Sequence, residues 1–95
     1  MDNYILDGKT PKLEMDLIKW ARWYSKADRI VKQTEVNECK VSTVFLGSAH
    51  SFNGEQPMLF ETMIFGGEHD GYQERCSTWE QAEKQHDDAI KLIFS

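Results

Sequence analysis

The sequence lacks the long apolar run that a membrane-spanning helix requires. No stretch approaches the roughly 20 consecutive apolar residues needed to cross a bilayer. The first residues, 1–4, also lack the basic segment followed by an apolar run that marks a secretory signal. These two absences argue against integral membrane proteins and exported proteins, and we expect a protein of the cytoplasm.

Cysteine is scarce as well, with two in 95 residues. Cys39 and Cys76 have no cysteine or histidine nearby at the spacing of a zinc site. Thiols in a cytosolic protein stay reduced, so we expect neither a disulfide nor a metal centre, and no cofactor is indicated. Arg75 beside Cys76 would favour the thiolate form, but no catalytic base accompanies it.

The chain also lacks repeats, linkers, low-complexity segments and recognisable catalytic motifs. Its 95 residues sit at the low end of ordinary domain sizes, which predicts one domain spanning residues 1–95. A hydrophobic content of 40% with 12% aromatic residues is enough for one real core, because disordered chains are poor in aromatics.

Basic residues are few in the second part of the chain. Residues 1–40 carry 8 Lys and Arg against 7 Asp and Glu, whereas residues 41–95 carry 3 against 9, which sums to the net charge of −5. An acidic surface repels phosphate backbones, so we expect no nucleic acid as the main partner, and a basic protein surface suits it better. The alternative is that the acids only keep a small domain soluble.

The first forty residues predict a strand, a helix and a second strand. Tyr4–Leu6 is a short apolar run that ends at the turn dipeptide Asp7-Gly8. One helical face then follows from the three- and four-residue spacing of Leu13, Leu17, Trp20, Ala21, Tyr24 and Ala27. The opposite face carries a basic ridge, Lys19, Arg22, Lys26 and Arg29.

Strands and turns then alternate up to residue 76. The expected strands are Arg29–Val36, Val41–Leu46, Leu59–Phe65 and the short edge strand Tyr72–Cys76. Asn37-Glu38 is a tight turn and Ser48–Pro57 is the longest loop.

The last element is an amphipathic helix. Ser77 and Glu80 fit a capping box, in which each side chain binds an otherwise unpaired backbone N–H. Its apolar stripe comprises Trp79, Ala82, His86, Ala89, Ile90 and Ile93. The predicted order is β-α-β-β-β-β-α, an α+β domain with a single antiparallel sheet of four to five strands and two helices packed on one face.

The middle strands carry apolar residues on both faces. Val41 and Phe45 point to one face, and Val44 and Leu46 point to the other. Residues 59–65 also carry apolar residues on both faces. Two helices shield only one face of an open sheet, so we expect the other face to meet another chain, either a host protein or a second copy in a homodimer.

Several side chains are candidate partner-binding residues. Trp20 and Trp23 cannot both face the core, and Trp23 is the better candidate for an exposed aromatic hot spot. The predicted partner-binding set is Trp23, Arg22, Lys26, His50, Phe52 and Glu61.

An alternative is a small ligand-binding protein or enzyme that uses the Ser48–Pro57 loop with Glu61 and His69. The ordinary alternatives are that His50 pins its loop, Glu61 faces water and His69-Asp70 is turn polarity. His86, on the apolar stripe, is predicted to be a hydrogen-bonded core histidine.

The chain resembles a family of small uncharacterised proteins of tailed phages and prophages. The resemblance rests on Tyr4–Pro11, Trp20–Trp23, Val41–Gly47 with His50 and Phe52, Leu59–Met63 with Phe65–Gly67, and Ser77–Glu80 with Ala82 and His86. It departs at Lys12–Met15 and around Glu55. It implies an accessory protein that acts in the cytoplasm of an infected bacterium. Small acidic phage proteins often inhibit host defence, as anti-CRISPR proteins do, which is an analogy of class.

Overall fold

The computed structural model describes residues 1–50 and 55–95. In these residues the chain forms antiparallel strands and two helices, as expected for an α+β protein. The elements are β1 (Asp2–Asp7), β2 (Thr10–Leu13), α1 (Leu17–Lys26), β3 (Ile30–Val36), β4 (Cys39–Phe45), β5 (Ser48–Ala49), β6 (Phe60–Phe65), β7 (Gln73–Cys76) and α2 (Trp79–Phe94).

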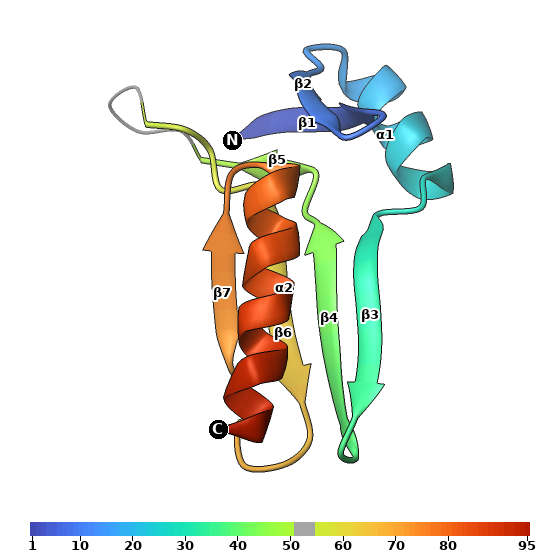
Figure 1. Ribbon diagram of the computed structural model, residues 1–95. Coiled ribbons are helices and arrows are strands. Elements are labelled where there is room, and N and C mark those ends of the chain that lie inside the picture. Colours follow the sequence, from blue (N-terminus) through green and yellow to red (C-terminus); the bar gives the residue numbers. More distant parts are fainter. Residues whose placement is uncertain (51–54) are drawn as a thin grey trace.

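The strands form two sheets, so the prediction of a single sheet was wrong. The larger sheet has the order β3-β4-β6-β7, and the smaller one has the order β2-β1-β5. The chain leaves the larger sheet after Phe45 and turns at Gly47 into the two-residue strand β5, which pairs with the start of β1. The N-terminal hairpin therefore lies across one end of the larger sheet (Figure 1).

The first helix begins later than the apolar spacing indicated. Leu13 pairs with Tyr4 in the β1–β2 hairpin, so it belongs to a strand. The helix starts after Asp16, whose carboxylate accepts hydrogen bonds from the backbone N–H groups of Ile18 at 3.0 Å and Lys19 at 3.1 Å. This N-cap satisfies amide groups that have no partner within the helix.

The turn predicted at Asn37-Glu38 is confirmed. Both residues have positive φ values, 50° and 64°, which is the backbone twist of a two-residue hairpin turn. Val36 pairs with Cys39 directly across it, so β3 and β4 form a tight hairpin. This hairpin fixes the register of one edge of the larger sheet.

The capping box of α2 lies one residue later than predicted. The N-cap is Thr78, whose hydroxyl accepts the backbone N–H of Gln81 at 3.1 Å. The Gln81 side chain in turn accepts the N–H groups of Thr78 and Ser77. A glutamine therefore takes the role that the sequence assigned to Glu80, and the amide serves because capping needs only an acceptor oxygen.

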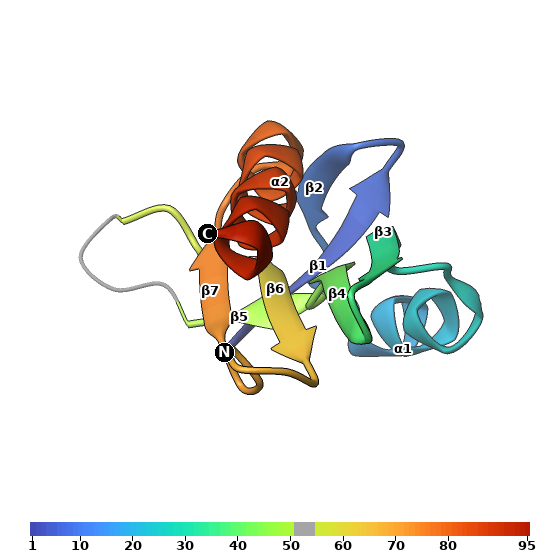
Figure 2. The ribbon, with the colours of Figure 1, turned by 60° about the horizontal axis from the view of Figure 1, so that its bottom comes forward.

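Of the two helices, α2 covers one face of the larger sheet, here called the inner face (Figure 2). Two apolar clusters lie under it. The first contains Phe45, Leu59, Phe60, Cys76 and Ala82, and the second contains Cys39, Val41, Ile64 and Ala89. Between them lies a polar layer of Thr43, Thr62 and His86, all with no exposed surface. The predicted apolar stripe of α2 is thereby confirmed at Ala82, His86 and Ala89.

Helix α1 does not share this face, so the prediction of two helices on one face was wrong. It packs against β1 at the end of the larger sheet (Figures 1 and 2). The opposite, outer face of the sheet is mixed in character. Ile30 and Phe65 are 48% and 47% exposed there, and they alternate with polar side chains such as Lys40 and Glu61. Among the described residues, neither helix is long and apolar enough to span a membrane.

Replacing Gly47 with alanine should destabilise the fold by about 1–3 kcal/mol. Gly47 has a φ of 83°, and an added Cβ would lie 2.9 Å from the Tyr24 ring on α1. Gly8 is the matched control, because its φ is also positive, at 63°, yet nothing lies within 4 Å of its Cβ position. The free energies of unfolding of both alanine variants are measured by urea denaturation, and the difference between their losses is the cost of the Tyr24 contact. Equal losses would contradict a close approach at Gly47.

Candidate protein-binding surface

The inner side of α1 is held by aromatic side chains. The Trp20 indole N–H donates to the backbone oxygens of Tyr4 at 3.1 Å and Gly47 at 3.0 Å, which ties the helix to β1 and to the connection between β4 and β5. Its ring contacts that of Tyr24, with centroids 4.9 Å apart. A partly buried indole that donates to two carbonyls fixes the rotation of the helix about its axis.

Trp23 belongs to this inner side, so the prediction of an exposed aromatic was wrong. Its ring meets the edge of Phe45 at a centroid distance of 5.8 Å and an interplanar angle of 86°, a T-shaped contact. Phe45 is fully buried in the first apolar cluster. Trp23 therefore joins α1 to the core and is partly buried.

Because Trp20, Trp23 and Tyr24 face inward, other apolar residues face water. Leu17 and Ile18 are 64% and 65% exposed, and the preceding Met15 is 88% exposed. Leu13, at the end of β2, is 51% exposed. These four side chains, Leu13, Met15, Leu17 and Ile18, lie within six consecutive residues and form what we call the α1 patch. A cluster of this kind on a small protein is typical of an interaction site.

Basic side chains border the α1 patch. Lys19, Arg22 and Lys26 are exposed, and none forms an ion pair within residues 1–50 and 55–95. Arg29, the fourth member of the predicted ridge, is engaged elsewhere. Its guanidinium lies 4.1 Å from the Tyr24 ring centroid and donates to the backbone oxygen of Phe45. The available ridge therefore has three cations.

The loop candidates are only partly placed. Phe52 lies outside the described residues. His50 is exposed and lines a hollow of about 330 Å³ together with Glu55 and Arg75. The α1 patch contributes none of the described residues that line this hollow.

Glu61 lies on the outer sheet face, as the ordinary interpretation predicted, but its side chain is largely covered and does not face open water. Its side chain is only 12% exposed, because it accepts hydrogen bonds from Arg75 Nε at 2.8 Å and from Gln73 Nε2. Three adjacent side chains of β6 and β7 thus satisfy one another. The main contacts of Glu61 are therefore with side chains of the neighbouring strand β7.

Glu61 and His69 do not share a site. Glu61 pairs with Arg75 near the start of β6, whereas His69 lies in the turn after its end. The strand between Glu61 and Phe65 spans roughly 13 Å at the usual rise per residue. Asp70 accepts the backbone N–H of Gly66 at 2.7 Å, which is the turn polarity predicted for His69-Asp70. The enzyme alternative therefore loses its proposed constellation.

Both cysteines are buried free thiols, as predicted. The expectation that Arg75 lowers the pKa of Cys76 was wrong. Burial raises the pKa of Cys76, and the nearby charge of Glu74 raises it further, although a hydrogen bond to the Thr78 carbonyl opposes this. Arg75 points to the opposite face of the sheet, where it pairs with Glu61. In the described residues, no group of three His, Cys, Asp or Glu side chains could hold a metal ion.

His86 is a hydrogen-bonded core histidine, as predicted. Its Nε2 lies 2.9 Å from the Thr34 hydroxyl and its Nδ1 lies 2.7 Å from the Thr43 hydroxyl, which also contacts Thr62 at 2.7 Å. No buried side-chain nitrogen or oxygen of the described residues lacks a partner. The polar layer is therefore fully hydrogen-bonded, as is typical of buried polar groups that stabilise a fold.

The sequence pattern missed the α1 patch, although a signal was present. Met15 and Ile18 are apolar residues that lie off the predicted helical face, and such surplus residues mark an exposed surface. Comparisons with protein-family models, curated proteins and solved structures gave no match. The candidate surface therefore rests on the geometry of this chain.

Proposed function

We propose that this protein acts by binding the surface of another protein through the α1 patch. The observation that carries the proposal is the cluster of four apolar side chains that are 51–88% exposed at the start of α1. Apolar side chains of this size release water when a partner covers them, at about 25 cal/mol per Å² of apolar area. A partner with a complementary apolar pocket would gain this free energy.

The charges beside the patch define the partner further. Lys19, Arg22 and Lys26 present three cations without ion pairs among the described residues, on a protein with a net charge of −5. An acidic partner surface would be attracted to this side and repelled by the rest of the molecule, which orients the encounter. We therefore infer an acidic protein surface with an apolar pocket as the partner. This reverses the expectation of a basic partner, which considered only the net charge.

The biological setting follows from the resemblance to phage accessory proteins. We propose that the partner is a host protein and that occupation of its surface inhibits a host defence system, as anti-CRISPR proteins do. A small protein without a recognisable catalytic constellation inhibits by blocking, and an exposed apolar patch with a charged rim suits that mechanism. The homodimer stays a prediction, which light scattering would test.

Replacing Ile18 with aspartate should abolish capture of the partner from a host lysate. The change places a charge in the α1 patch, and an acid in the first turn of a helix does not destabilise it. Phe94→Asp is the matched control, because Phe94 is an apolar residue of similar exposure, 62% against 65%, at the other end of the molecule. Captured proteins are compared by mass spectrometry at two salt concentrations.

The proposal predicts a protein that is retained by wild type and Phe94→Asp, lost with Ile18→Asp and weakened by salt. Recovery of the same proteins with Ile18→Asp would contradict it, as would recovery of none with wild type. Circular dichroism of both variants checks that the fold is kept.

A further inference from the structure

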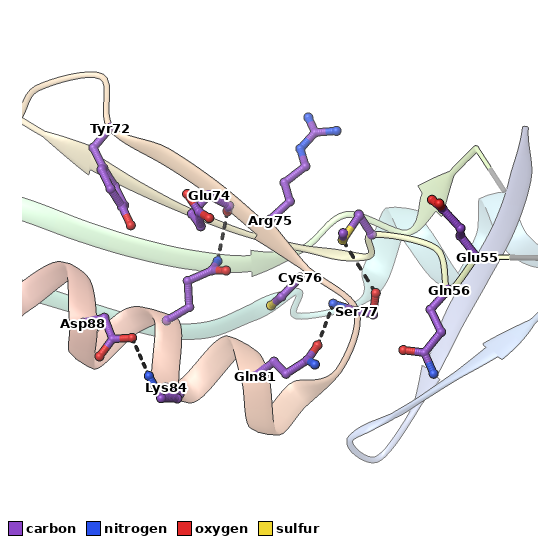
Figure 3. Close-up of a pocket in the computed structure, with 12 residues that line it drawn as sticks. Glu55, Gln56, Tyr72, Glu74, Arg75, Cys76, Ser77, Gln81, Lys84 and Asp88 are labelled. Carbon is purple, nitrogen blue, oxygen red and sulfur yellow. Dashed lines mark hydrogen bonds and ion pairs between the residues drawn. The ribbon is translucent and has the colours of Figure 1, made fainter. Parts of the chain in front are cut away.

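A groove separates the free edge of β7 from α2. Its volume is about 660 Å³, and it runs from Tyr72 at one end to Glu55 at the other (Figure 3). Side chains of both elements line it, among them Glu74 and Cys76 from the strand and Lys84 from the helix. We call it the β7–α2 groove, and it is distinct from the α1 patch.

The backbone of β7 offers unused hydrogen-bonding groups to this groove. The strand is at the edge of the larger sheet, and the backbone oxygens of Tyr72 and Cys76 accept from the β6 side, from Ile64 and Leu59. Peptide groups alternate in direction along an antiparallel strand. The N–H and C=O groups of Gln73 and Arg75 therefore point away from β6, and the described part of the chain pairs no strand with them.

The groove is preformed. Gln85 of α2 donates to the backbone oxygen of Glu74 at 2.9 Å and to the Thr62 hydroxyl at 3.0 Å, which fixes the distance between helix and strand. On the rim, Lys84 and Asp88 form an ion pair at 2.8 Å (Figure 3). A ligand would therefore bind without the entropy cost of ordering the side chains that line the groove.

The described lining of the groove carries more acidic than basic side chains, Glu55, Glu74 and Asp88 against Arg75 and Lys84. Lys84 is neutralised by Asp88, and Arg75 points away from α2 (Figure 3). On the outer face Arg75 pairs with Glu61. Glu74 forms no ion pair with the other described residues. Burial, followed by the charges of Glu74 and Asp88, raises the pKa of Tyr72. A cationic side chain would thus be favoured between strand and helix.

We propose that the β7–α2 groove binds an extended peptide, which adds to the sheet beside β7 and places a lysine or arginine near Glu74. Strand addition in a groove between an edge strand and a helix obtains affinity from main-chain hydrogen bonds and specificity from alternate side chains. The opposite edge, β3, is less suited. Its register shifts between Ile30 and Lys32, and such a bulge disfavours addition of a further strand.

The test begins with selection from a display library of random peptides of roughly eight residues, a length that spans the strand at about 3.3 Å per residue. Selected peptides should contain a basic residue and bind the wild-type protein. Arg75→Pro removes the outward N–H and leaves the bonds to β6 intact, because proline is tolerated on a free edge. It should weaken binding by roughly tenfold or more, as expected for unmade backbone hydrogen bonds.

Arg75→Ala is the matched control, because it removes the same side chain and keeps the N–H. It should bind like wild type, because the Arg75 side chain pairs with Glu61 on the outer face and makes none of the proposed backbone hydrogen bonds. Hydrogen exchange supplies a second measurement, in which the amides of Gln73 and Arg75 become protected when peptide is added to the wild-type protein.

Failure to select any peptide would overturn the proposal. Equal binding by Arg75→Pro and Arg75→Ala would do the same, as would amides that stay unprotected. If Arg75→Pro does not fold, peptides methylated at alternate backbone nitrogens replace it, and undiminished binding by them contradicts strand addition. Ile18→Asp should not affect peptide binding. The proposal for the β7–α2 groove and the proposal for the α1 patch can therefore be refuted independently of each other.

Discussion

Replacing Trp23 with alanine should lower the free energy of unfolding by about 3 kcal/mol. The Trp23 ring meets the fully buried Phe45 in a T-shaped contact and joins the first apolar cluster. Its removal leaves a void between α1 and the sheets. Helix α1 cannot move in to fill this void, because Trp20 holds it at the backbone oxygen of Gly47. Urea denaturation followed by circular dichroism measures the loss.

Ile18→Ala is the control for Trp23→Ala. It lies on the same helix and is 65% exposed, so its removal should change the free energy of unfolding by less than about 0.5 kcal/mol. The opposite pattern, a stable Trp23→Ala variant that no longer binds a partner, would return Trp23 to the hot-spot role that the sequence suggested. The two variants thus separate an anchor from a binding surface on one helix.

The face of α1 was ambiguous in the sequence for a physical reason. Leu17, Trp20, Tyr24 and Ala27 fit one apolar spacing, and Trp20, Trp23, Tyr24 and Ala27 fit another that is rotated from it. Periodicity cannot choose between overlapping arcs. The choice depends on the carbonyls of Tyr4 and Gly47, which accept the Trp20 indole and come from distant parts of the chain.

The strands of the larger sheet were predictable because their signals are local. β4 and β6 are rich in β-branched and aromatic residues, and positive φ values at Asn37-Glu38 and at glycines end the strands. β2 carries no such signal. It is a four-residue strand with Pro11 and Lys12, and only its pairing with β1 makes it a strand. β5 has two residues and depends in the same way on β1.

The candidate sites also have some features that the sequence could predict and others that only the structure reveals. The edge position of β7 could be predicted from the order of the strands, and the groove beside it could not, because its width is fixed by the contact between Gln85 and Glu74. Glu61 looked unusual as a charge between apolar neighbours. Its explanation, Arg75 and Gln73 across the strand pair, requires the register of β6 and β7.

Replacing His86 with alanine should cost about 2–4 kcal/mol, because it opens a cavity under α2 and removes hydrogen bonds to the buried Thr43 hydroxyl and the partly buried Thr34 hydroxyl. The polar layer lies between the two apolar clusters, so the variant weakens both. Thr43 retains Thr62 as a partner, whereas Thr34 loses the only one found among the described residues. Thermal unfolding measures the loss, and a change below about 1 kcal/mol would contradict a structural role.

His86 should also make stability depend on pH. Burial lowers its pKa below the usual 6.5, Lys32 lowers it further, and Asp87 opposes this weakly. The unfolded chain keeps the ordinary pKa, so below about pH 6.5 it binds more protons than the folded protein does. Stability is therefore complete above that pH and falls as the pH drops towards the lowered pKa of the folded state.

Denaturation at a series of pH values between about 8 and 5 measures this fall. His86→Gln cannot titrate, so it should be less stable than wild type at pH 8 and lose less stability on acidification. His69→Gln is the control, because His69 lies in the turn before β7, outside the polar layer, and should leave the fall unchanged. If stability fell with pH as steeply in His86→Gln as in wild type, and less steeply in His69→Gln, His86 would not cause the pH dependence. The polar layer would then stabilise the protein equally whether His86 is neutral or protonated.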